Sequence, residues 1–175
     1  GRRFARAYSP LPLTIPAHGS IFTGKYPPSL GLRSNGSGKL TSDQLTLTEV
    51  LKDAGYQTAG SVAAFVTTRE WGFQQGFDHY FDDIPQDKPG NFWHDERPAE
   101  HVIDDILDWK TTQKGEAPIF VWMHLYDPHF PYRPPDRYVN EVKGRPYDGE
   151  LAYVDDQLKR VFDAFGEDAL YVVAG

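Results

Sequence analysis

The stretch PLTIPAHGSIFTGKYPP, residues 12–28, holds an alcohol, a proline, a histidine and a closing turn within one short segment. Pro16 suits the first turn of a helix, because the N–H group that a proline lacks has no partner there. Gly24 suits the residue after the last turn, because glycine adopts positive φ at no steric cost. The segment therefore predicts a short helix over about Ile15–Phe22 that ends at Gly24.

Thr14, directly before this helix, has two interpretations. As an N-cap, its hydroxyl accepts a hydrogen bond from the Ala17 amide and stabilises the helix by about 1 kcal/mol. As a nucleophile, Thr14 would attack an anionic ester, which the positive end of the helix attracts to the same position. An alcohol needs a base or a metal to react as an alkoxide at neutral pH. The sequence places no base beside Thr14, because His18 lies one turn further along, so a metal would have to come from elsewhere.

The rest of the chain alternates between strand and helix patterns. Three helices are expected, at residues 46–55, 98–114 and 147–165, and three strands, at residues 56–66, 118–126 and 169–175. The alternation predicts an α/β fold, a parallel sheet with helices on both faces. In such sheets, function gathers in the loops after the carboxyl ends of the strands.

Individual residues refine these expectations. Thr46 and Glu49 have the spacing of a capping box. The last helix carries an apolar stripe with spacings of three and four, at Leu151, Val154, Leu158, Val161 and Phe165. The aromatic-rich segment from Thr67 to Arg97, which includes Phe92 and Trp93, has no clear period and is expected to be a loop or excursion.

Composition excludes several classes of function. The 175 residues carry a formal charge of -7 and no basic stripe, which argues against a nucleic-acid partner. No apolar run approaches the length of a membrane span, and residues 1–4 show no signal-peptide pattern. The chain contains no cysteine, which excludes disulfides, thiolate metal sites and cysteine nucleophiles.

The segment TIPAHGSIFTGKYPPSLGLRSNG, residues 14–36, resembles the nucleophile segment of the sulfatase family in the alkaline phosphatase superfamily. The family pattern is Cys or Ser, any residue, Pro, a small residue and Arg, followed by a helix that ends in Thr-Gly-x-Tyr-Pro. Thr14 matches the nucleophile, Pro16 the proline, Ala17 the small residue and His18 the arginine. TLTEVLKDAGYQTA, FVWMHLYDPHFPYRPP and YDGELAYVDDQLKRVFDAF resemble later family segments in the same order, so the resemblance covers essentially the whole chain.

The resemblance implies a three-layer sandwich around a parallel sheet, of which residues 1–175 form part of a single catalytic domain. It implies hydrolysis of a sulfate ester, or of a related phosphate or phosphonate ester, in a small anionic substrate. It also implies a divalent cation (Ca, Mn or Zn) bound by Thr14 and by acidic motifs that would lie outside both ends of the chain. This fragment alone is therefore expected to be inactive. Relatives are often exported, but the sequence does not decide the compartment.

Departures from the family pattern carry information. The formylglycine of sulfatases is made from Cys or Ser in a Cys/Ser-x-Pro-x-Arg context, whereas this chain has Thr14 and His18. An unmodified Thr alkoxide resembles the nucleophile of phosphodiesterases in the same superfamily. The usual Gly-Lys-x-His-Leu-Gly segment is also missing, and Lys25 is a nearby cation that would compensate as a substrate-binding residue. His18 would contact the anion in place of arginine, or would orient Thr14.

The segment MHLYDPHFPY, residues 123–132, gives a second candidate site after a buried strand. His124 alternates with apolar residues, which is typical of a hydrogen-bonded wall residue, and it is also a candidate substrate-binding residue. His129 lies between two prolines, and the resemblance matches it to a histidine near the scissile ester. There it would hydrogen-bond to the transferred group or protonate the leaving oxygen. Asp127 is expected to cap the turn, and Asp105 to lie on a solvated helix face.

Three functions stay open at this point. The first is a metal-dependent ester hydrolase with Thr14 and His129 in catalytic roles. The second is a noncatalytic relative that binds an anionic ester or a protein partner. The third is a structural α/β domain in which Thr14 only caps a helix.

Overall fold

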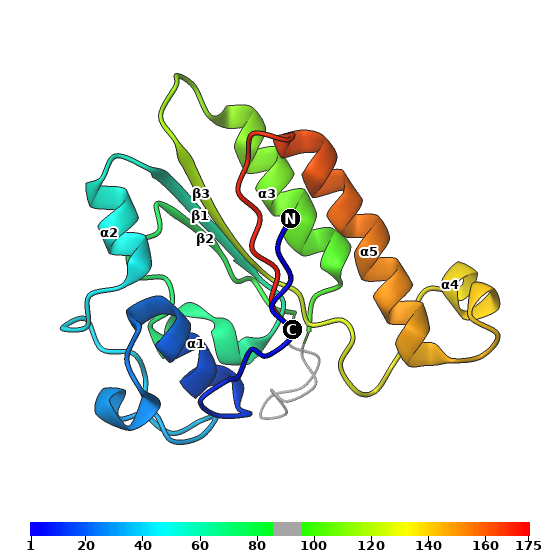
Figure 1. Cartoon of the computed structure of the whole chain (residues 1–175), viewed down its shortest axis with the longest axis horizontal. Helices are drawn as coiled ribbons and strands as arrows, with labels where there is room; N and C mark the ends of the chain where they lie inside the picture. The colour runs from blue at the N-terminus through cyan, green and yellow to red at the C-terminus, as the bar shows by residue number, and fades with distance from the viewer. Residues whose placement is uncertain (86–95) are drawn as a thin grey trace. The chain divides into compact units, whose positions relative to one another are not determined.

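A three-stranded sheet organises the fold. The structure is a computed structural model that describes residues 1–85 and 96–175. Within these residues the strands are ordered β2-β1-β3 in the sheet, as Figure 1 shows. They are β1 (Gln57–Val62), β2 (His79–Phe81) and β3 (Ile119–His124). Residues 58–62 of β1, the central strand, are all buried.

Strands β1 and β3 run parallel. Gln57 donates its N–H to the carbonyl of Pro118 at 2.9 Å, and further along both strands Ala63 donates to the carbonyl of His124 at 3.0 Å. The two partners advance in the same direction, which is the pattern of a parallel ladder. The predicted α/β class with a parallel sheet is confirmed.

The chain divides into two compact units, and the division runs through β1 and β3. Unit one consists of Gly1–Gly60, Phe65–Asp82 and Glu116–Val121. Unit two consists of Ser61–Ala64, Asp83–Gly115 and Trp122–Gly175.

In unit one, helix α1 (Thr14–Thr23) packs closely against the segment after the 3-10 helix η1 (Pro27–Leu30). A Cβ added to Gly19 would lie 2.4 Å from Cδ1 of Leu32, so the contact requires either glycine or a displaced leucine. Gly24 ends the helix with a φ of 68°, as the sequence predicts. The close contact fixes α1, and with it the residues at its beginning.

Unit one also contains α2 (Leu47–Asp53) and the 3-10 helices η2 (Phe65–Thr67) and η3 (Arg69–Trp71). Helix α2 begins at the predicted capping box. The Thr46 hydroxyl accepts a hydrogen bond from the Glu49 N–H at 3.2 Å, and the Glu49 carboxylate accepts one from the Thr46 N–H at 2.8 Å. This prediction is confirmed.

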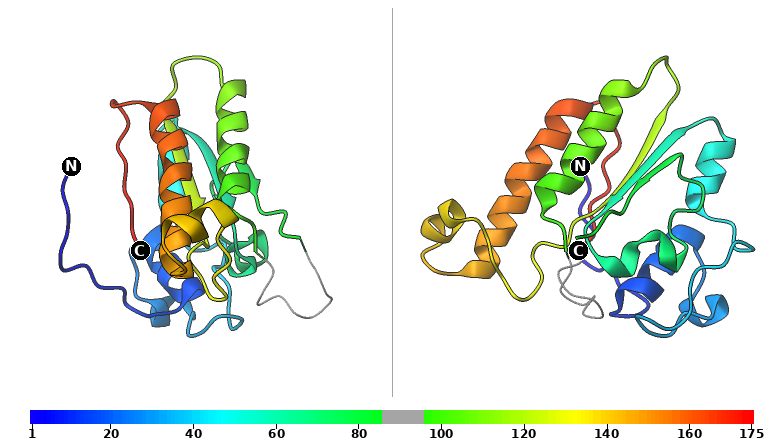
Figure 2. Two further views of the ribbon diagram at one scale, coloured as in Figure 1. Left: turned by 90° about the vertical axis from the view of Figure 1, so that its right-hand side faces the viewer. Right: turned by 180° about the vertical axis from the view of Figure 1, so that it is seen from behind.

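In unit two, α3 (Ala99–Thr112) and α5 (Pro146–Phe165) lie side by side, as Figure 1 and Figure 2 show. The short helix α4 (Asp136–Glu141) precedes α5. Helix α3, predicted over residues 98–114, buries an apolar face formed by Val102, Ile103, Ile106 and Trp109. A second cluster joins Ala99 to Tyr138 and Tyr153, whose rings lie 5.6 Å apart.

The buried face of α5 matches the predicted stripe only in part: Val161 is 2% exposed, as predicted, but the start of the helix differs. Leu151 of the predicted stripe is 43% exposed, whereas the neighbouring Glu150 and Tyr153 are 4% and 3% exposed. The reason is local packing. A Cβ added to Gly149 would lie 2.8 Å from Cγ of Pro134, so the first turn of α5 lies against the loop that follows β3. The loop therefore packs against Gly149 at the start of α5, whereas Val161 of the predicted stripe is buried further along the helix.

Residues 169–175 do not form the predicted strand. Leu170 and Val172 are 91% and 84% exposed, and no ladder pairs this segment with another strand among the described residues. A strand exists only when a neighbour supplies hydrogen-bond partners, so an apolar β-branched pattern alone does not make one. Strand β3 also differs from its prediction. Its apolar run predicts a strand buried on both faces of the sheet, but its residues are half-buried.

The predicted excursion over residues 67–97 contains η3 and β2. Phe92, Trp93 and the rest of residues 86–95 lie outside the described residues. Among the described helices, none combines the length and the apolar composition needed to cross a membrane.

Candidate active site

Thr14 is the first residue of α1 and not its cap. The cap position belongs to Leu13, which is extended, and the Ala17 N–H donates to the Leu13 carbonyl at 3.0 Å. The predicted bond from Ala17 to the Thr14 hydroxyl is therefore wrong, because the helix begins one residue earlier and uses that amide itself. Among the described residues the Thr14 hydroxyl makes no hydrogen bond. The half-buried side chain thus stands at the positive end of a helix with its hydroxyl uncommitted.

Asn35 caps α1 from outside the helix. Its Oδ1 accepts a hydrogen bond from the Ile15 N–H at 2.9 Å, across 20 residues of sequence. The sequence reasoning did not single out this residue. The available signal was the Asn35-Gly36 turn, because Gly36 has a φ of 80° and asparagine in turns offers its side-chain oxygen to nearby amides.

His18 contacts the backbone of Thr14. Its Nδ1 lies 2.8 Å from the Thr14 carbonyl oxygen, and because a carbonyl only accepts, Nδ1 carries the proton. Burial lowers the pKa of His18 below 6.5, although the hydrogen bond to Thr14 acts in the opposite direction. The ring also lies edge-on to Phe73, with centroids 5.9 Å apart. A neutral imidazole held in this way fixes the first turn of α1 and does not supply the positive charge of an arginine.

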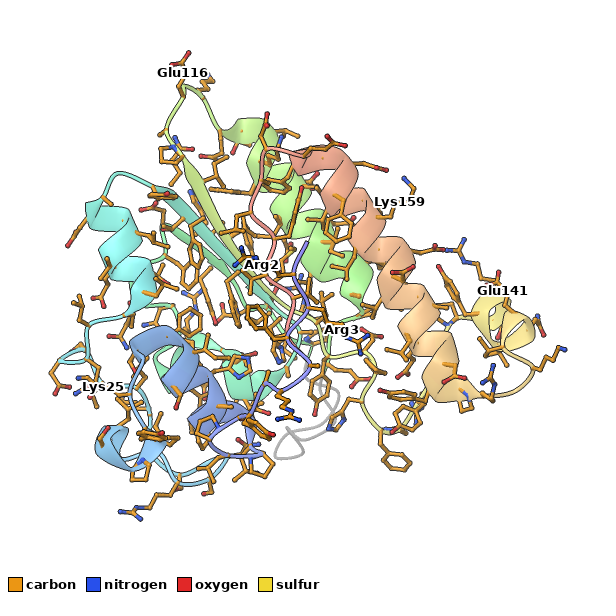
Figure 3. All side chains as sticks on the ribbon, in the orientation of Figure 1. Arg2, Arg3, Lys25, Glu116, Glu141 and Lys159 are labelled. Carbon is orange, nitrogen blue, oxygen red and sulfur yellow. The ribbon has the colours of Figure 1, made fainter. Side chains whose placement is uncertain are left out.

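Lys25 lies beyond the other end of α1. The ten residues of this helix rise about 15 Å, so Lys25 and Thr14 are separated by that length. The Lys25 ammonium donates to Oε1 of Gln44 at 2.8 Å, and Figure 3 marks its position. A pocket of about 300 Å³ lies at this end of the helix, lined by Tyr8, Ser9, Pro10, Ser20, Gly24, Lys25 and Tyr26. The substrate-binding role of Lys25 stays a prediction.

In unit two, His124 and His129 belong to the end of β3 and to the following loop. His124 is half-buried, and its ring lies 6.1 Å from that of Tyr126. His129 is exposed, and its Nε2 lies 3.0 Å from the Tyr126 hydroxyl with the two rings stacked 4.1 Å apart. Burial, and to a lesser extent the charge of Glu96, raise the pKa of Tyr126, so this phenol stays protonated at neutral pH. The stack gives the exposed His129 a defined position.

Two carboxylates secure the loop that carries His129. Asp127 Oδ2 accepts a hydrogen bond from the Ala99 N–H at 3.0 Å, and therefore caps α3. Glu150 Oε1 accepts one from the Arg133 N–H at 2.5 Å. The sequence reasoning missed Glu150. The feature of the sequence that could have indicated it is a carboxylate among the apolar residues at the start of α5.

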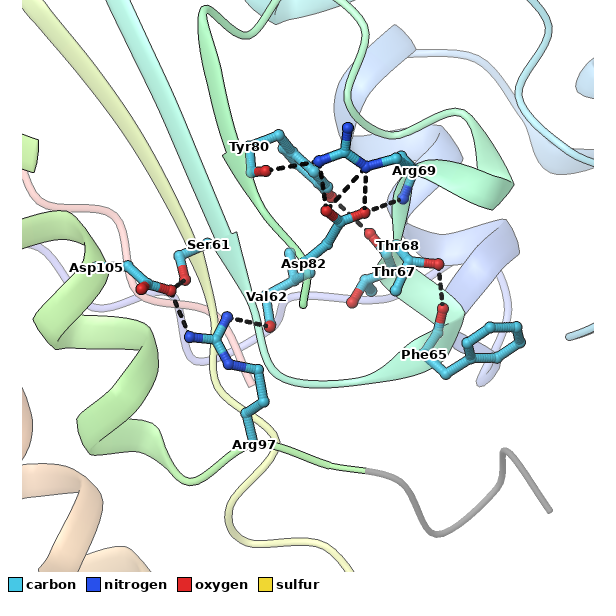
Figure 4. A network of polar contacts seen from close by, with 10 residues as sticks. All are labelled: Ser61, Val62, Phe65, Thr67, Thr68, Arg69, Tyr80, Asp82, Arg97 and Asp105. Atoms are coloured by element: carbon cyan, nitrogen blue, oxygen red, sulfur yellow. Dashed lines mark hydrogen bonds and ion pairs between the residues drawn. The ribbon is translucent and has the colours of Figure 1, made fainter. Parts of the chain in front are cut away.

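Charged networks hold the scaffold in each unit (Figure 4). In unit two, the Arg97 guanidinium lies 2.5 Å from Asp105, whose carboxylate also accepts a hydrogen bond from Ser61 at 2.8 Å. Asp105 is thus paired, and the prediction of a solvated helix face is wrong there. In unit one, Asp82 accepts hydrogen bonds from both the side chain and the backbone of Arg69. These pairs hold the backbone, and no predicted site residue takes part in them.

Comparison with known proteins identifies the family. The family model described as Sulfatase matches residues 1–173 of the chain. The chain belongs to the sulfatase family. This finding confirms the resemblance that the segment at residues 14–36 indicates.

Two curated sulfatases are similar in sequence. An ulvan-active sulfatase from Formosa agariphila is 29% identical over 149 residues, which cover 74% of this chain and 29% of the relative. An N-acetylglucosamine-6-O-sulfatase from Bacteroides thetaiotaomicron is 27% identical over 151 residues, which cover 79% of this chain and 26% of the relative. The chain thus spans less than a third of the length of these curated relatives.

A phosphonate monoester hydrolase of Agrobacterium radiobacter is similar in structure. The TM-score is 0.66 with 14% sequence identity, and the match covers 90% of this chain and 50% of the other. At this identity the likeness concerns the fold alone. The sulfatase fold is therefore shared with an enzyme named for phosphonate esters.

Sulfatases of this superfamily are generally metal-dependent, so we tested whether the described residues fit a metal ion. Over residues 1–85 and 96–175, no three His, Asp or Glu side chains gather where they would hold one. Thr14 offers a single oxygen. This part of the sulfatase chain does not by itself fit a complete metal site.

Proposed function

We propose that the protein containing this chain hydrolyses sulfate esters, with Thr14 as the nucleophile and His129 as the group that assists the leaving oxygen. The observation that carries the proposal is the uncommitted hydroxyl of Thr14 at the beginning of α1, in a chain of the sulfatase family. Thr14 lies at the positive end of the helix, where the oxygens of an anionic ester are stabilised. The amides of Ile15 and Ala17 are already bonded to Asn35 and Leu13, so this stabilisation comes from the helix dipole and not from those amides.

In the proposed reaction Thr14 Oγ1 attacks the sulfur atom in line with the leaving oxygen. The new Oγ1–S bond forms as the bond from sulfur to the leaving oxygen breaks, and that oxygen takes its proton from His129. Water then hydrolyses the sulfated threonine and restores the hydroxyl. His18 holds the Thr14 carbonyl, and therefore keeps the attacking residue in the first turn of the helix.

The activation of Thr14 requires a group that removes its proton. The Nδ1 atom of His18 does not provide it, because its hydrogen bond goes to the Thr14 carbonyl and not to the hydroxyl. A divalent cation bound at Thr14 would lower the pKa of the hydroxyl, so that its proton would pass to solvent water, and would stabilise charge on the ester oxygens. His124 and Lys25 are the further candidates for contact with the substrate.

One feature of the sequence favours a second substrate class. Thr14 and His18 stand where the family pattern has Cys or Ser and Arg, so the aldehyde chemistry of formylglycine does not apply to this chain. An unmodified threonine alkoxide attacks phosphorus by the same in-line geometry. Phosphonate and phosphate esters are therefore the second candidate substrates.

The test compares variants of the full-length protein, supplied in turn with Ca²⁺, Mn²⁺ and Zn²⁺. Turnover of 4-nitrophenyl sulfate, a 6-O-sulfated glucosamine, a phosphonate monoester and a phosphate diester is measured. Thr14→Ala is expected to lower kcat about 10³-fold or more on every ester that the wild type hydrolyses. Thr23→Ala is the matched control, because Thr23 is on the same helix and its hydroxyl bonds only within α1 and its closing turn.

Each outcome decides between the alternatives. A Thr14→Ala protein that retains wild-type turnover would show that another group is the nucleophile. A folded wild type that binds these esters but hydrolyses none, with all three metals, would indicate the noncatalytic relative. Preference for the phosphonate or the diester over both sulfates would assign the second substrate class.

A further inference from the structure

The loop between β3 and α4, residues 125–135, is attached to its unit at two places. Asp127 caps the N-terminus of α3 through the Ala99 amide. Six residues further along the loop, the Arg133 amide donates to Glu150 of α5 at 2.5 Å. His129 lies between these two attachments, so its position depends on both.

Glu150 is unusual among the carboxylates of residues 1–85 and 96–175. It is 4% exposed although it belongs to the first turns of a helix, where most charged side chains reach water. Its Oε1 accepts the Arg133 amide, whereas its Oε2 is buried without a hydrogen-bond partner in the described residues. A buried carboxylate costs free energy, so a role other than stability is the better account of its presence.

The backbone next to Glu150 also packs against the loop. Gly149 meets Pro134 so closely that a Cβ would lie 2.8 Å from its Cγ. The loop and the first turn of α5 therefore touch at two successive residues on each side, Gly149 with Pro134 and Glu150 with Arg133. Tyr153, one turn later, accepts a hydrogen bond from the Glu100 amide at 3.0 Å and joins the same turn of α5 to α3.

Two of the charges near Glu150, those of Asp127 and His129, belong to the same loop, and a third, that of Glu96, lies just before α3. Burial raises the pKa of Glu150, as do the negative charges of Asp127 and Glu96, whereas the Arg133 amide and the positive charge of His129 lower it. Glu150 thus lies within electrostatic range of His129 as well as being bonded to the backbone of its loop.

We infer that Glu150 is a positioning residue for His129, which it acts on by fixing the Arg133 end of the loop. The inference builds on the proposed function, in which His129 protonates the leaving oxygen. Loss of this hydrogen bond would leave the Asp127 cap, the Tyr126 stack and the packing of Pro134 on Gly149 as the remaining restraints on the loop. The reaction would then lose general-acid assistance while keeping its nucleophile.

The experiment measures hydrogen exchange and turnover in the full-length protein. The variants are Glu150→Ala, which removes the acceptor, and Glu150→Gln, which keeps an acceptor oxygen. Asp155→Asn is the matched control, since Asp155 is an exposed carboxylate on the same helix. Exchange is followed by mass spectrometry in peptides that cover residues 126–134.

Glu150→Ala is expected to speed exchange at the Arg133 amide about tenfold or more. Turnover of an alkyl sulfate, whose leaving oxygen needs a proton, should fall at least tenfold in kcat with little change in KM. Turnover of 4-nitrophenyl sulfate should fall less than threefold, because nitrophenolate leaves without a proton. Glu150→Gln and Asp155→Asn should resemble the wild type in all three measurements. A role in stability alone would lower the turnover of both esters equally.

Unchanged exchange in Glu150→Ala, or equal losses on the two sulfates, would overturn the inference. If Glu150→Ala does not fold, Glu150→Asp replaces it, because the shorter side chain keeps the charge and withdraws the acceptor. If the wild type hydrolyses no ester, the proposed function fails, and the exchange measurement still decides whether Glu150 fixes the loop.

Discussion

At the scale of single residues, backbone contacts decide what each candidate side chain does. His18 donates to the Thr14 carbonyl, and Asn35 accepts from the Ile15 amide, so both act on the first turn of α1. Thr14 is left without a capping role because Leu13 provides the carbonyl for Ala17. A residue type in a motif therefore indicates candidate chemistry, and the hydrogen bonds around it select among the candidates.

His18 should make stability depend on pH. Its pKa is lowered in the folded state by burial, so the unfolded chain takes up a proton at a higher pH than the folded chain does. Its contribution to the free energy of unfolding is therefore complete above pH 6.5 and is lost as the pH falls through the lowered pKa. His18→Asn, which keeps a donor near the position of Nδ1, should remove this part of the pH dependence.

The measurement is urea unfolding of the wild type and His18→Asn between pH 5 and 8. The difference in free energy of unfolding should be constant near pH 8 and should shrink towards pH 5, as the wild type loses its advantage. Two curves that stay parallel over the whole range would show that His18 titrates alike in the folded and unfolded chains.

At the scale of secondary-structure elements, α2 carries the clearest local signal. Thr46 and Glu49 exchange hydrogen bonds across the first turn, and Thr46 is 2% exposed. Thr46→Ala should therefore lower the free energy of unfolding by about 1–2 kcal/mol, the usual cost of losing an N-cap. Thr41→Ala, at an exposed threonine just before the helix, should change it by less than about 0.5 kcal/mol. Chemical denaturation measures both, and equal effects would mean that the cap contributes nothing beyond the loss of a methyl and a hydroxyl.

Signals that lie within one element were predictable from sequence. The capping box of α2, the glycine that ends α1 and the buried face of α3 each involve residues within a few turns of one another. The burial at the start of α5 was not predictable, because Gly149 and Glu150 face a loop that lies before them in the sequence. The strand expected over residues 169–175 failed for a related reason, since its apolar pattern does not supply a partner.

The residues of the candidate site also fall into those that the sequence predicts and those that it does not. Thr14, His18 and His129 were selected from sequence by residue type and motif. The residues that hold them, Asn35 and Glu150, were not selected, because each acts through an amide 17 or 20 positions away. Such pairs are determined by tertiary packing, and neither spacing nor hydrophobic pattern encodes them.

At the scale of the whole molecule, the net charge of -7 includes a few carboxylates whose burial lowers the stability of the folded chain when they are ionised. Burial is the main cause that raises the pKa of Glu150 from 4.5 and that of Asp127 from 3.8. For an acid with a raised pKa, the stability of the fold is greatest while the group is protonated. It is lost as the pH rises from the ordinary value through the raised one.

Glu150→Gln should therefore become relatively more stable than the wild type as the pH rises from 4.5 to 7. The amide keeps the acceptor for Arg133 and carries no charge to bury. Thermal unfolding at several pH values gives the difference between the two proteins. A difference that is independent of pH would mean that water or a counter-charge already compensates the ionised carboxylate.

The strand order has a consequence for the order of folding. Central β1 pairs with β2, which follows it closely in the chain, and with β3, which follows only after α3. Closing a short loop costs less conformational entropy than closing a long one, so the β1–β2 pair should form first during refolding. In pulse-labelled hydrogen exchange, the Asp78 amide, bonded to Thr58, should become protected before the Ala63 amide, bonded to His124. If so, a nascent chain that ends before residue 119 can already pair β1 with β2. The other side of β1 then stays unpaired until β3 has been synthesised.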